Sequence, residues 1–312
     1  VLHHCTASTP PTAGLLHGIH GITLTSGSPA PPVASGGAIP RGGAPQMRPT
    51  ERLRSYVASY SEYDMSGWPG GRHRGLPDGA LNLVVSIDVP LKIRRKGQAD
   101  LEATATISGL RAQPLDIVHR GCGQGVQIEI TPPGSRALLG LPAAELANGV
   151  WPLDEVVGTR ARELIERLLE QAGPMPRARA LDAVLVGWVH DAAYPRVVDT
   201  AWHRLVASAG SVSVARLADE AGLSRRHLSE VLRAELGLTP KTVARVLRFA
   251  RARTSLRSGR TATLAETAAT CGYFDQAHLS NEWKRLAGCT PGQWIAEELP
   301  FLQDRDMFDD AS

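Results

Sequence analysis

The chain has 312 residues, of which 43% are hydrophobic and 21% are charged, and its formal net charge is +3. This is the composition of a globular protein that is long enough for two ordinary domains. No apolar run approaches the ~18 residues that a membrane-spanning helix needs, so we expect no membrane partner.

Residues 1–45 are rich in Pro, Gly, Ser, Thr and Ala and carry almost no charge, which predicts a disordered N-terminal extension. The stretch lacks the basic start and the clean apolar run of a signal peptide. The four cysteines are scattered along the chain without the spacing of metal ligands. These features favour a cytoplasmic protein without a bound metal.

Residues 46–195 are expected to form a β-rich sensor or dimerisation domain whose C-terminal part is helical. Within it, Ala80–Ile93 is rich in Val, Leu and Ile, and Val126–Thr131 alternates apolar and polar side chains. Both patterns are typical of short strands, and turns rich in Pro and Gly separate them.

Helices are predicted after these strands. Leu153–Glu170 places apolar residues at helical spacing on one face, and Leu181–Val189 and Val198–Val206 repeat that spacing. Gly-Pro and Tyr-Pro pairs separate the three segments. We expect an antiparallel helical pair here, which is also the candidate face for a homodimer.

Two groups of polar residues in the same domain are candidates for binding a small-molecule effector. They are His73, Arg74, Asp78, Asn82, His119 and Arg120. An arginine could hold an acid group of the ligand, whereas a metal site would need the two groups to be brought together. The alternative interpretation is that most of them are turn residues and buried hydrogen-bond partners. We predict no metal and no cofactor.

A repeated segment marks residues 196–299. Gly222–Pro240, GLSRRHLSEVLRAELGLTP, recurs as Gly272–Pro291, GYFDQAHLSNEWKRLAGCTP, with one extra residue near the start of the second copy. Such self-similarity indicates a duplicated supersecondary unit, and the unit has the pattern of a helix-turn-helix. Two units about fifty residues apart predict a protein that contacts DNA at two successive places.

Turn and cap residues delimit the helices of both copies. Gly222 and Gly272 are predicted to supply the turns, and Ser224 and Asp275 to cap the recognition helices that follow. Between the copies, Pro240–Arg257 is predicted to be a connecting helix of about 27 Å. A spacer of that length can hold two recognition helices about one DNA turn, roughly 34 Å, apart.

Polar residues that this burial pattern leaves exposed form the candidate DNA-binding face. In the recognition helices 224–236 and 275–287 they are Arg225, Arg226, Ser229, Arg233, Gln276, Ser280, Asn281, Lys284 and Arg285. The connecting helix is expected to add Arg245, Arg248, Arg251 and Arg253 on its solvent side. Arginine suits guanine, and Gln or Asn suits adenine, whereas Lys284 and Arg285 lie far enough along the helix to meet phosphate.

For any one of these residues, the alternative to a role in DNA binding is that it lies on an ordinary solvent-exposed helix face. Two observations favour DNA for the set. The two recognition helices present matching polar faces, and residues 201–299 hold 14 Lys and Arg against 9 Asp and Glu, an excess of +5.

The repeated segment resembles the AraC/XylS family of bacterial transcription regulators over about residues 201–298. ARLADEAGLSRRHLSEVLRAELGLTP, residues 215–240, is similar to the family's first helix-turn-helix, and AATCGYFDQAHLSNEWKRLAGCTPGQW, residues 268–294, to its second signature. The resemblance implies that the two units bind adjacent major-groove segments on one face of the DNA. It implies base contacts from Arg226, Ser229, Glu230, Gln276, Ala277 and Asn281. Asn281 stands where the family usually carries Arg.

The N-terminal half is more loosely similar to the β-rich sensor of one branch of such regulators, through GLPDGALNLVVSID at 75–88 and GLPAAEL at 140–146. That resemblance names no ligand.

The sequence therefore predicts an α+β chain, with a β-rich N-terminal domain and flanking helices followed by an all-α domain with two helix-turn-helix units, and an acidic tail at 300–312. We expect a DNA-binding transcription regulator that is not an enzyme. Its partners are operator DNA, a candidate effector, a candidate second copy of the chain, and RNA polymerase if it is an activator. The alternative is an enzyme in residues 46–200 fused to a DNA-binding tail.

Overall fold

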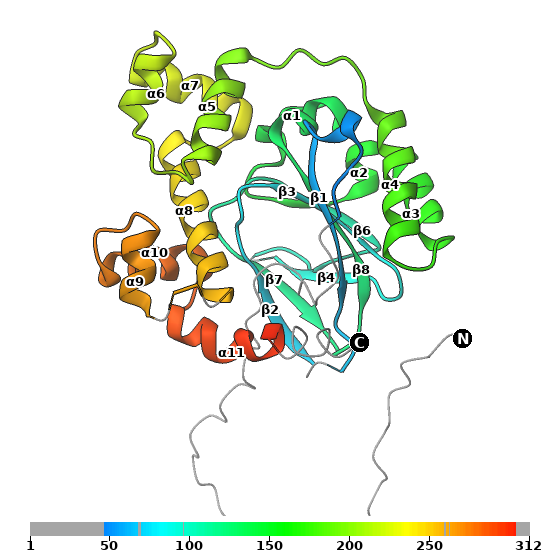
Figure 1. Cartoon of the computed structure of the whole chain (residues 1–312). Coiled ribbons are helices and arrows are strands. Elements are labelled where there is room, and N and C mark those ends of the chain that lie inside the picture. Colours follow the sequence, from blue (N-terminus) through cyan, green and yellow to red (C-terminus); the bar gives the residue numbers. More distant parts are fainter. Residues whose placement is uncertain (1–46, 68–69, 96, 259, 262, 304–312) are drawn as a thin grey trace, which may run out of the picture.

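The computed structural model describes residues 47–303 with the exception of 68, 69, 96, 259 and 262. The expected N-terminal extension at 1–45 lies outside the described residues, and so does most of the tail at 300–312. The chain forms a β-rich half and a helical half that lie side by side (Figure 1). The predicted order, a β-rich N-terminal region followed by a helical C-terminal region, is confirmed.

Two antiparallel sheets build the β-rich half. The five-stranded sheet has the order β1 (Val57–Asp64), β8 (Gln124–Ile130), β3 (Leu81–Ser86), β6 (Ala105–Ser108) and β9 (Val150–Pro152). The four-stranded sheet has the order β2 (Gly71–Gly75), β7 (Leu115–His119), β4 (Leu91–Arg94) and β5 (Leu101–Ala103). Every residue of β3 is buried because both faces of this strand are covered. Val84 faces a small core shared with β4 and β7, whereas Leu83 and Val85 belong to the main core.

Helical turns and helices accompany the strands of the β-rich half and lead to the C-terminal half. They are turns at Glu51–Leu53, Ser135–Leu139 and Ala143–Leu146, and helices α1 (Pro132–Gly134), α2 (Leu153–Val157), α3 (Arg160–Leu169) and α4 (Pro174–Trp188). Helices α3 and α4 lie side by side on the outside of the five-stranded sheet (Figure 1). The short connection between them makes the pair antiparallel, as the sequence predicts.

Two predictions for this region are wrong. The apolar spacing from Leu153 to Glu170 predicts a single helix, but the chain breaks at Gly158, which has φ +61°. Both resulting helices bury residues in the same core, so the apolar pattern continues across the break and hides it. Val206, which the spacing puts on the buried face of the next helix, is 46% exposed.

The C-terminal half consists of helices. They are α5 (Arg196–Ala207), α6 (Val214–Glu220), α7 (Arg225–Leu236), α8 (Pro240–Arg257), α9 (Leu264–Thr270), α10 (Gln276–Ala287) and α11 (Pro291–Gln303). Helix α11 continues past residue 299, so the boundary expected there falls inside a helix. Among the described residues, no helix is both long and apolar enough to cross a bilayer.

The two halves share their hydrophobic cores. The main core runs without interruption from Leu83 in β3 to Leu228 and Leu232 in α7. A second core joins Leu76, which follows β2, to residues of α8 through α11 such as Phe249. Each helix-turn-helix unit is therefore packed against the β-rich half.

Candidate nucleic-acid interface

The two copies of the repeat fold into the same local structure. Helix α6 and helix α9 each end in a glycine turn, at Gly222 with φ +65° and at Gly272 with φ +79°. A left-handed backbone of this kind is cheap only for glycine, and it redirects the chain into the next helix. The predicted turns are confirmed in both copies.

Cap residues then fix where each recognition helix begins and ends. The Ser224 hydroxyl accepts a hydrogen bond from the N–H of His227 at 3.2 Å, and the Asp275 carboxylate accepts one from the N–H of His278 at 2.6 Å. Helices α7 and α10 both end at glycines in the left-handed conformation. The predicted N-caps are confirmed.

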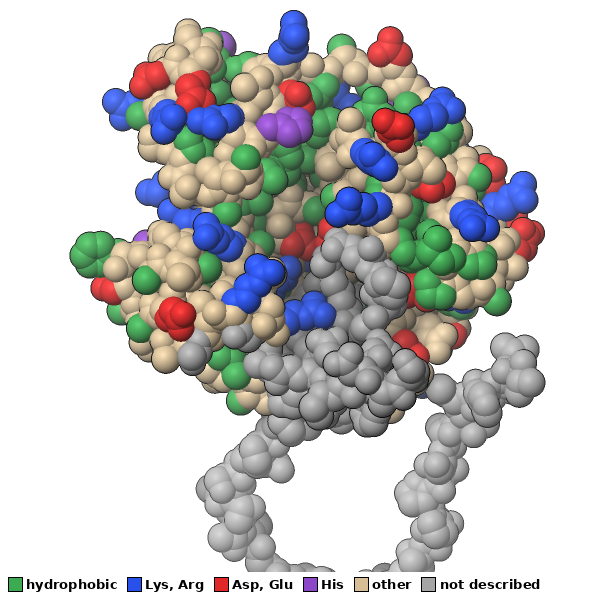
Figure 2. All heavy atoms as spheres, viewed as in Figure 1, with side chains coloured by type: hydrophobic (Ala, Val, Ile, Leu, Met, Phe, Trp, Pro, Cys, Tyr) green, Lys and Arg blue, Asp and Glu red, His purple; other side chains and the backbone are tan. Residues whose placement is uncertain are grey.

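Each recognition helix buries one face and exposes the other. Leu228, Leu232 and Leu236 of α7 are fully buried, and so are Leu279 and Trp283 of α10. The predicted DNA-facing residues that are exposed are Arg225, Arg226, Glu230, Arg233, Gln276, Ala277, Asn281, Lys284 and Arg285. Ser229 and Ser280 are half-buried. Lys and Arg side chains are frequent on the side of the molecule that carries α6, α7 and α8 (Figure 2).

Within α7 the exposed side chains already contact one another. The Arg226 guanidinium donates to the Glu230 carboxylate at 2.9 Å, although the Arg226 side chain is 90% exposed. The Ser229 hydroxyl donates to the carbonyl of Arg225 at 2.8 Å. An exposed pair of this kind contributes at most about 1 kcal/mol, so Arg226 can leave Glu230 for another acceptor at little cost.

The arginines of the connecting helix α8 are not the solvent-facing row that the sequence predicts. Arg251 is exposed, but Arg245, Arg248 and Arg253 are half-buried. The Arg245 guanidinium donates to the carboxylate of Glu282 in α10 at 2.7 Å, and Arg248 lies over the ring of Tyr273. The prediction fails because α8 packs against four helices, α5, α7, α9 and α10, so its arginines do not share one solvent-exposed face.

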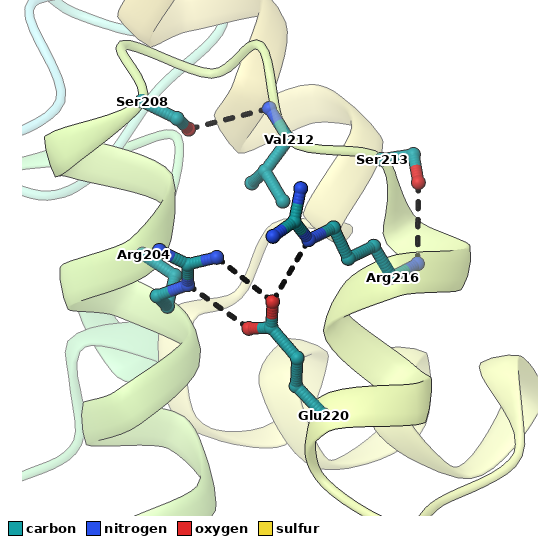
Figure 3. A network of polar contacts seen from close by, with 6 residues as sticks. All are labelled: Arg204, Ser208, Val212, Ser213, Arg216 and Glu220. Carbon is teal, nitrogen blue, oxygen red and sulfur yellow. Dashed lines mark hydrogen bonds and ion pairs between the residues drawn. The ribbon is translucent and has the colours of Figure 1, made fainter.

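A polar network fixes the scaffold helix of the first copy (Figure 3). Glu220 in α6 accepts two hydrogen bonds from Arg204 in α5, at 2.8 and 2.9 Å, and one from Arg216 at 3.0 Å. Hydrogen bonds from Arg204 and then from Arg216 lower the pKa of Glu220. The N–H of Arg216 donates in turn to the Ser213 hydroxyl, which caps α6. The network ties α6 to α5.

Two buried glutamates escaped the sequence analysis. Glu235 in α7 accepts two hydrogen bonds from Arg136, at 2.7 and 2.8 Å, and Arg136 belongs to the β-rich half. Glu282 in α10 is bound by Arg245 and lies 3.5 Å from Arg285. Both glutamates stand at apolar positions of the helical period, seven residues after Leu228 and three after Leu279. An acidic residue at a core position was the available signal for a buried ion pair.

The candidate effector residues separate into three places. The rings of His73 and His119 are 5.2 Å apart, and burial followed by the nearby His119 lowers the pKa of His73 to about 3. Arg74 lies 3.9 Å from Glu297 in α11. Asp78 accepts from the amide of Asn82 at 3.1 Å, as a turn residue does. Within the described ranges, no three His, Cys, Asp or Glu side chains gather as metal ligands would.

A cavity of about 400 Å³ opens beside His119 and Arg120, at the end of the β-rich half. Most of its lining is apolar, including Tyr63 and Met65, and Lys92 contributes a second cation. This volume is in the range of pockets that hold small organic molecules.

Comparisons with known proteins agree with this geometry. Residues 217–297 match a family model described as a helix-turn-helix domain, and residues 45–152 match one described as a domain of unknown function. No curated protein matches the chain at a significant level.

Two solved structures illustrate the similarity. ToxT from Vibrio cholerae is 13% identical with a TM-score of 0.48, over 76% of this chain and 97% of that chain. An AraC-type regulator from Chromobacterium violaceum is 24% identical with a TM-score of 0.30, over 33% of this chain and 92% of that one. Scores this low establish neither a shared ligand nor a shared way of binding.

The helix-turn-helix match spans both recognition helices, with the caps, glycine turns and exposed polar faces described above. Residues 217–297 of the chain therefore form a helix-turn-helix domain.

Proposed function

We propose that the chain is a DNA-binding transcription regulator of the AraC/XylS type that reads a bipartite operator, with the N-terminal parts of α7 and α10 in two successive major-groove segments. The observation that carries the proposal is the pair of matched, exposed polar faces on either side of α8, a helix of 18 residues. At 1.5 Å per residue α8 is about 27 Å long, which suits sites about one DNA turn apart.

The exposed side chains divide by the part of DNA that they suit. Arg226 suits guanine, and Gln276 and Asn281 suit adenine. Glu230 could accept from the amino group of cytosine, and Ala277 could contact a thymine methyl. We assign Ser229 to the bases as well. The remaining exposed or half-buried residues would position the protein on phosphates, and they are Arg225, Arg233, Ser280, Lys284 and Arg285.

Selection from random-sequence DNA at a stated, near-physiological salt concentration tests this proposal. The full-length protein should enrich a motif of two blocks about one helical turn apart. Arg226→Ala should weaken binding by about 1–3 kcal/mol and relax the preference at one base pair. Arg162→Ala, an exposed arginine on α3, is the matched control and should bind as the wild type does. An equal loss on all sequences would make Arg226 a phosphate contact.

The β-rich half is proposed to bind a small effector in the cavity beside His119 and Arg120. The apolar lining suits a ligand with an apolar body, and the cations Arg120 and Lys92 suit an acidic group on it. An anionic fluorescent probe such as anilinonaphthalene sulfonate should bind there, and Arg120→Gln should weaken that binding. Equal probe binding by the variant would remove Arg120 from the site.

Occupation of the cavity can reach the recognition helices because the two halves are joined at both helix-turn-helix units. Arg136 holds Glu235 at the end of α7, and a side chain at Gly237 would meet the Cβ of Ala147 at 2.2 Å. At the second unit, Leu76 lies in the core of α8 through α11. A shift of the β-rich half therefore has to move α7, α10 or both.

A second copy of the chain and RNA polymerase are the remaining proposed partners. Leu169 at the end of α3 and Met175 at the start of α4 are 50% and 56% exposed. Hydrophobic side chains gather on the side of the molecule where α3 and α4 lie (Figures 1 and 2). Leu169→Glu should lower the mass measured by sedimentation if this face joins two copies. An unchanged dimer would place the contact elsewhere, and a wild type that sediments as a monomer would remove the second copy from the proposal. No specific observation favours the alternative of an enzyme in residues 46–200.

A further inference from the structure

The second helix-turn-helix copy is one residue longer than the first, and the backbone identifies the additional residue. The N–H groups of Leu223 and Tyr273 both donate at 2.9 Å to the carbonyl five residues earlier, so these two residues occupy equivalent places after the glycine turns. Ser224 follows Leu223 directly as N-cap, whereas one residue stands between Tyr273 and the N-cap Asp275. The additional residue is Phe274.

Phe274 is held in a defined position with its ring in solvent. Its side chain is 92% exposed, more than that of any other large hydrophobic residue among those that the structure describes. Its N–H donates to Nδ1 of His278 at 3.2 Å, and the His278 ring packs edge-on against Tyr273 at 5.3 Å. Tyr273 itself is buried, so the chain places one aromatic residue in the core and the next one in water.

The position of this ring points to DNA. Phe274 directly precedes the N-cap of α10, and the N-terminal end of a recognition helix is the part that meets base edges. On the major-groove edge the distinctive apolar group is the C5-methyl of thymine, and Phe is one of the side chains that contact it. A phenyl ring left in water regains a favourable hydrophobic contribution when such a methyl covers it.

We propose that Phe274 packs against the C5-methyl group of a thymine at the edge of the major-groove segment read by α10, so that the second copy selects an A·T pair that the first copy does not. The inference rests on the proposed function, because it needs α10 in the major groove. It adds an apolar specificity contact from the turn to the polar contacts of the helix.

Uracil substitution tests the contact, because uracil lacks only the methyl group. The full-length wild type and Phe274→Ala are titrated against the selected duplex and against duplexes in which single thymines are replaced by uracil. One uracil should weaken wild-type binding about fourfold, and Phe274→Ala should weaken binding to the thymine duplex about tenfold. The variant should no longer respond to that uracil. Its salt dependence should match that of the wild type, since no phosphate contact is lost.

Controls separate the outcomes. Val206→Ala removes another exposed apolar side chain, in α5 and outside both helix-turn-helix units, and should bind both duplexes as the wild type does. Wild-type affinity of Phe274→Ala for the thymine duplex, or equal affinity of the wild type for all uracil duplexes, overturns the proposal. Normal DNA binding with a loss of transcription by added RNA polymerase also overturns it and makes Phe274 a protein contact. If the wild type selects no motif at all, the proposed function itself has failed.

Discussion

The two recognition helices share a sequence pattern but are anchored to different parts of the molecule. Each contains one buried glutamate, and the two stand at different positions of the repeat. Glu235 of α7 reaches out of the helical half to Arg136, whereas Glu282 of α10 stays inside it and binds Arg245 of the connecting helix. At the place of Glu235, the second copy carries the core residue Leu286.

This difference suggests a division of labour after the duplication. The second unit is fixed to α8, so its orientation relative to the connecting helix is set within the helical half. The first unit is held by the β-rich half, so a change there reaches α7 through Arg136. The β-rich half also meets the second unit, but there through Leu76 in the second core and through the ion pair of Arg74 with Glu297 of α11.

The largest expected effect comes from removing the arginine of either buried ion pair. We call these pairs, Arg245–Glu282 and Arg136–Glu235, the two anchors. Arg245→Ala should lower the free energy of unfolding by about 3 kcal/mol, because it leaves Glu282 buried without its closest cation. Arg136→Ala should cost slightly less, because the Arg136 side chain is 32% exposed and water can reach the site. Urea denaturation measures both. An unchanged unfolding free energy in either variant would contradict the corresponding anchor.

DNA binding then separates the roles of the two anchors. Replacing Arg136 and Glu235 together by Met should largely restore stability, since a buried ion pair can be exchanged for apolar residues at little cost. The double variant should still lose the change in DNA affinity that a ligand in the cavity of the β-rich half causes in the wild type. Retention of the full response would show that Arg136 does not couple the halves.

Two equivalent glycines sharpen the comparison with a smaller effect. Gly237 and Gly288 end α7 and α10 with φ +72° and +71°, so alanine is strained equally at both. A Cβ at Gly237 would also lie 2.2 Å from the Cβ of Ala147, whereas at Gly288 the nearest atom, in Pro114, is 3.7 Å away. Gly237→Ala should therefore destabilise by about 1–3 kcal/mol more than Gly288→Ala.

Thermal unfolding of the two variants measures the difference, and Ala147→Gly in the Gly237→Ala background should recover part of it. Equal costs at the two glycines would mean that α7 does not press on the β-rich half as closely as described.

Acid should destabilise the β-rich half. This is the smallest expected effect, after those of the anchor and glycine substitutions. Burial lowers the pKa of His73 to about 3 from the ordinary value of 6.5. The unfolded chain therefore binds a proton below pH 6.5 that the folded chain does not bind until about pH 3. Stability is fully present above pH 6.5 and falls by up to about 1.4 kcal/mol per pH unit below it. Denaturation at pH 7.5, 6.5 and 5.5 should show this loss, and His73→Gln should reduce it. A pH-independent wild type would contradict the buried, neutral state of His73.

The predictions for the effector residues and for the arginines of α8 fail for the same structural reason. His73 and Arg74 are neighbours in the sequence, but successive strand residues face opposite sides, so His73 meets His119 and Arg74 meets α11. The sequence predicts that the arginines of α8 lie on one solvent-exposed face, but Arg245 is covered by α10. In both cases the partner comes from a segment that is distant in the chain.

Local chemistry let the sequence by itself determine the elements of the helix-turn-helix units. Ser224 and Asp275 cap helices through amides three residues away, and glycines end α7 and α10 through their own backbone freedom, so no distant residue takes part. Only the tertiary structure decided how those units are held, because Arg136 and Glu235 are 99 residues apart. Such a pairing depends on how the packed layers meet, and helical periodicity records that a position is buried without recording which neighbour buries it.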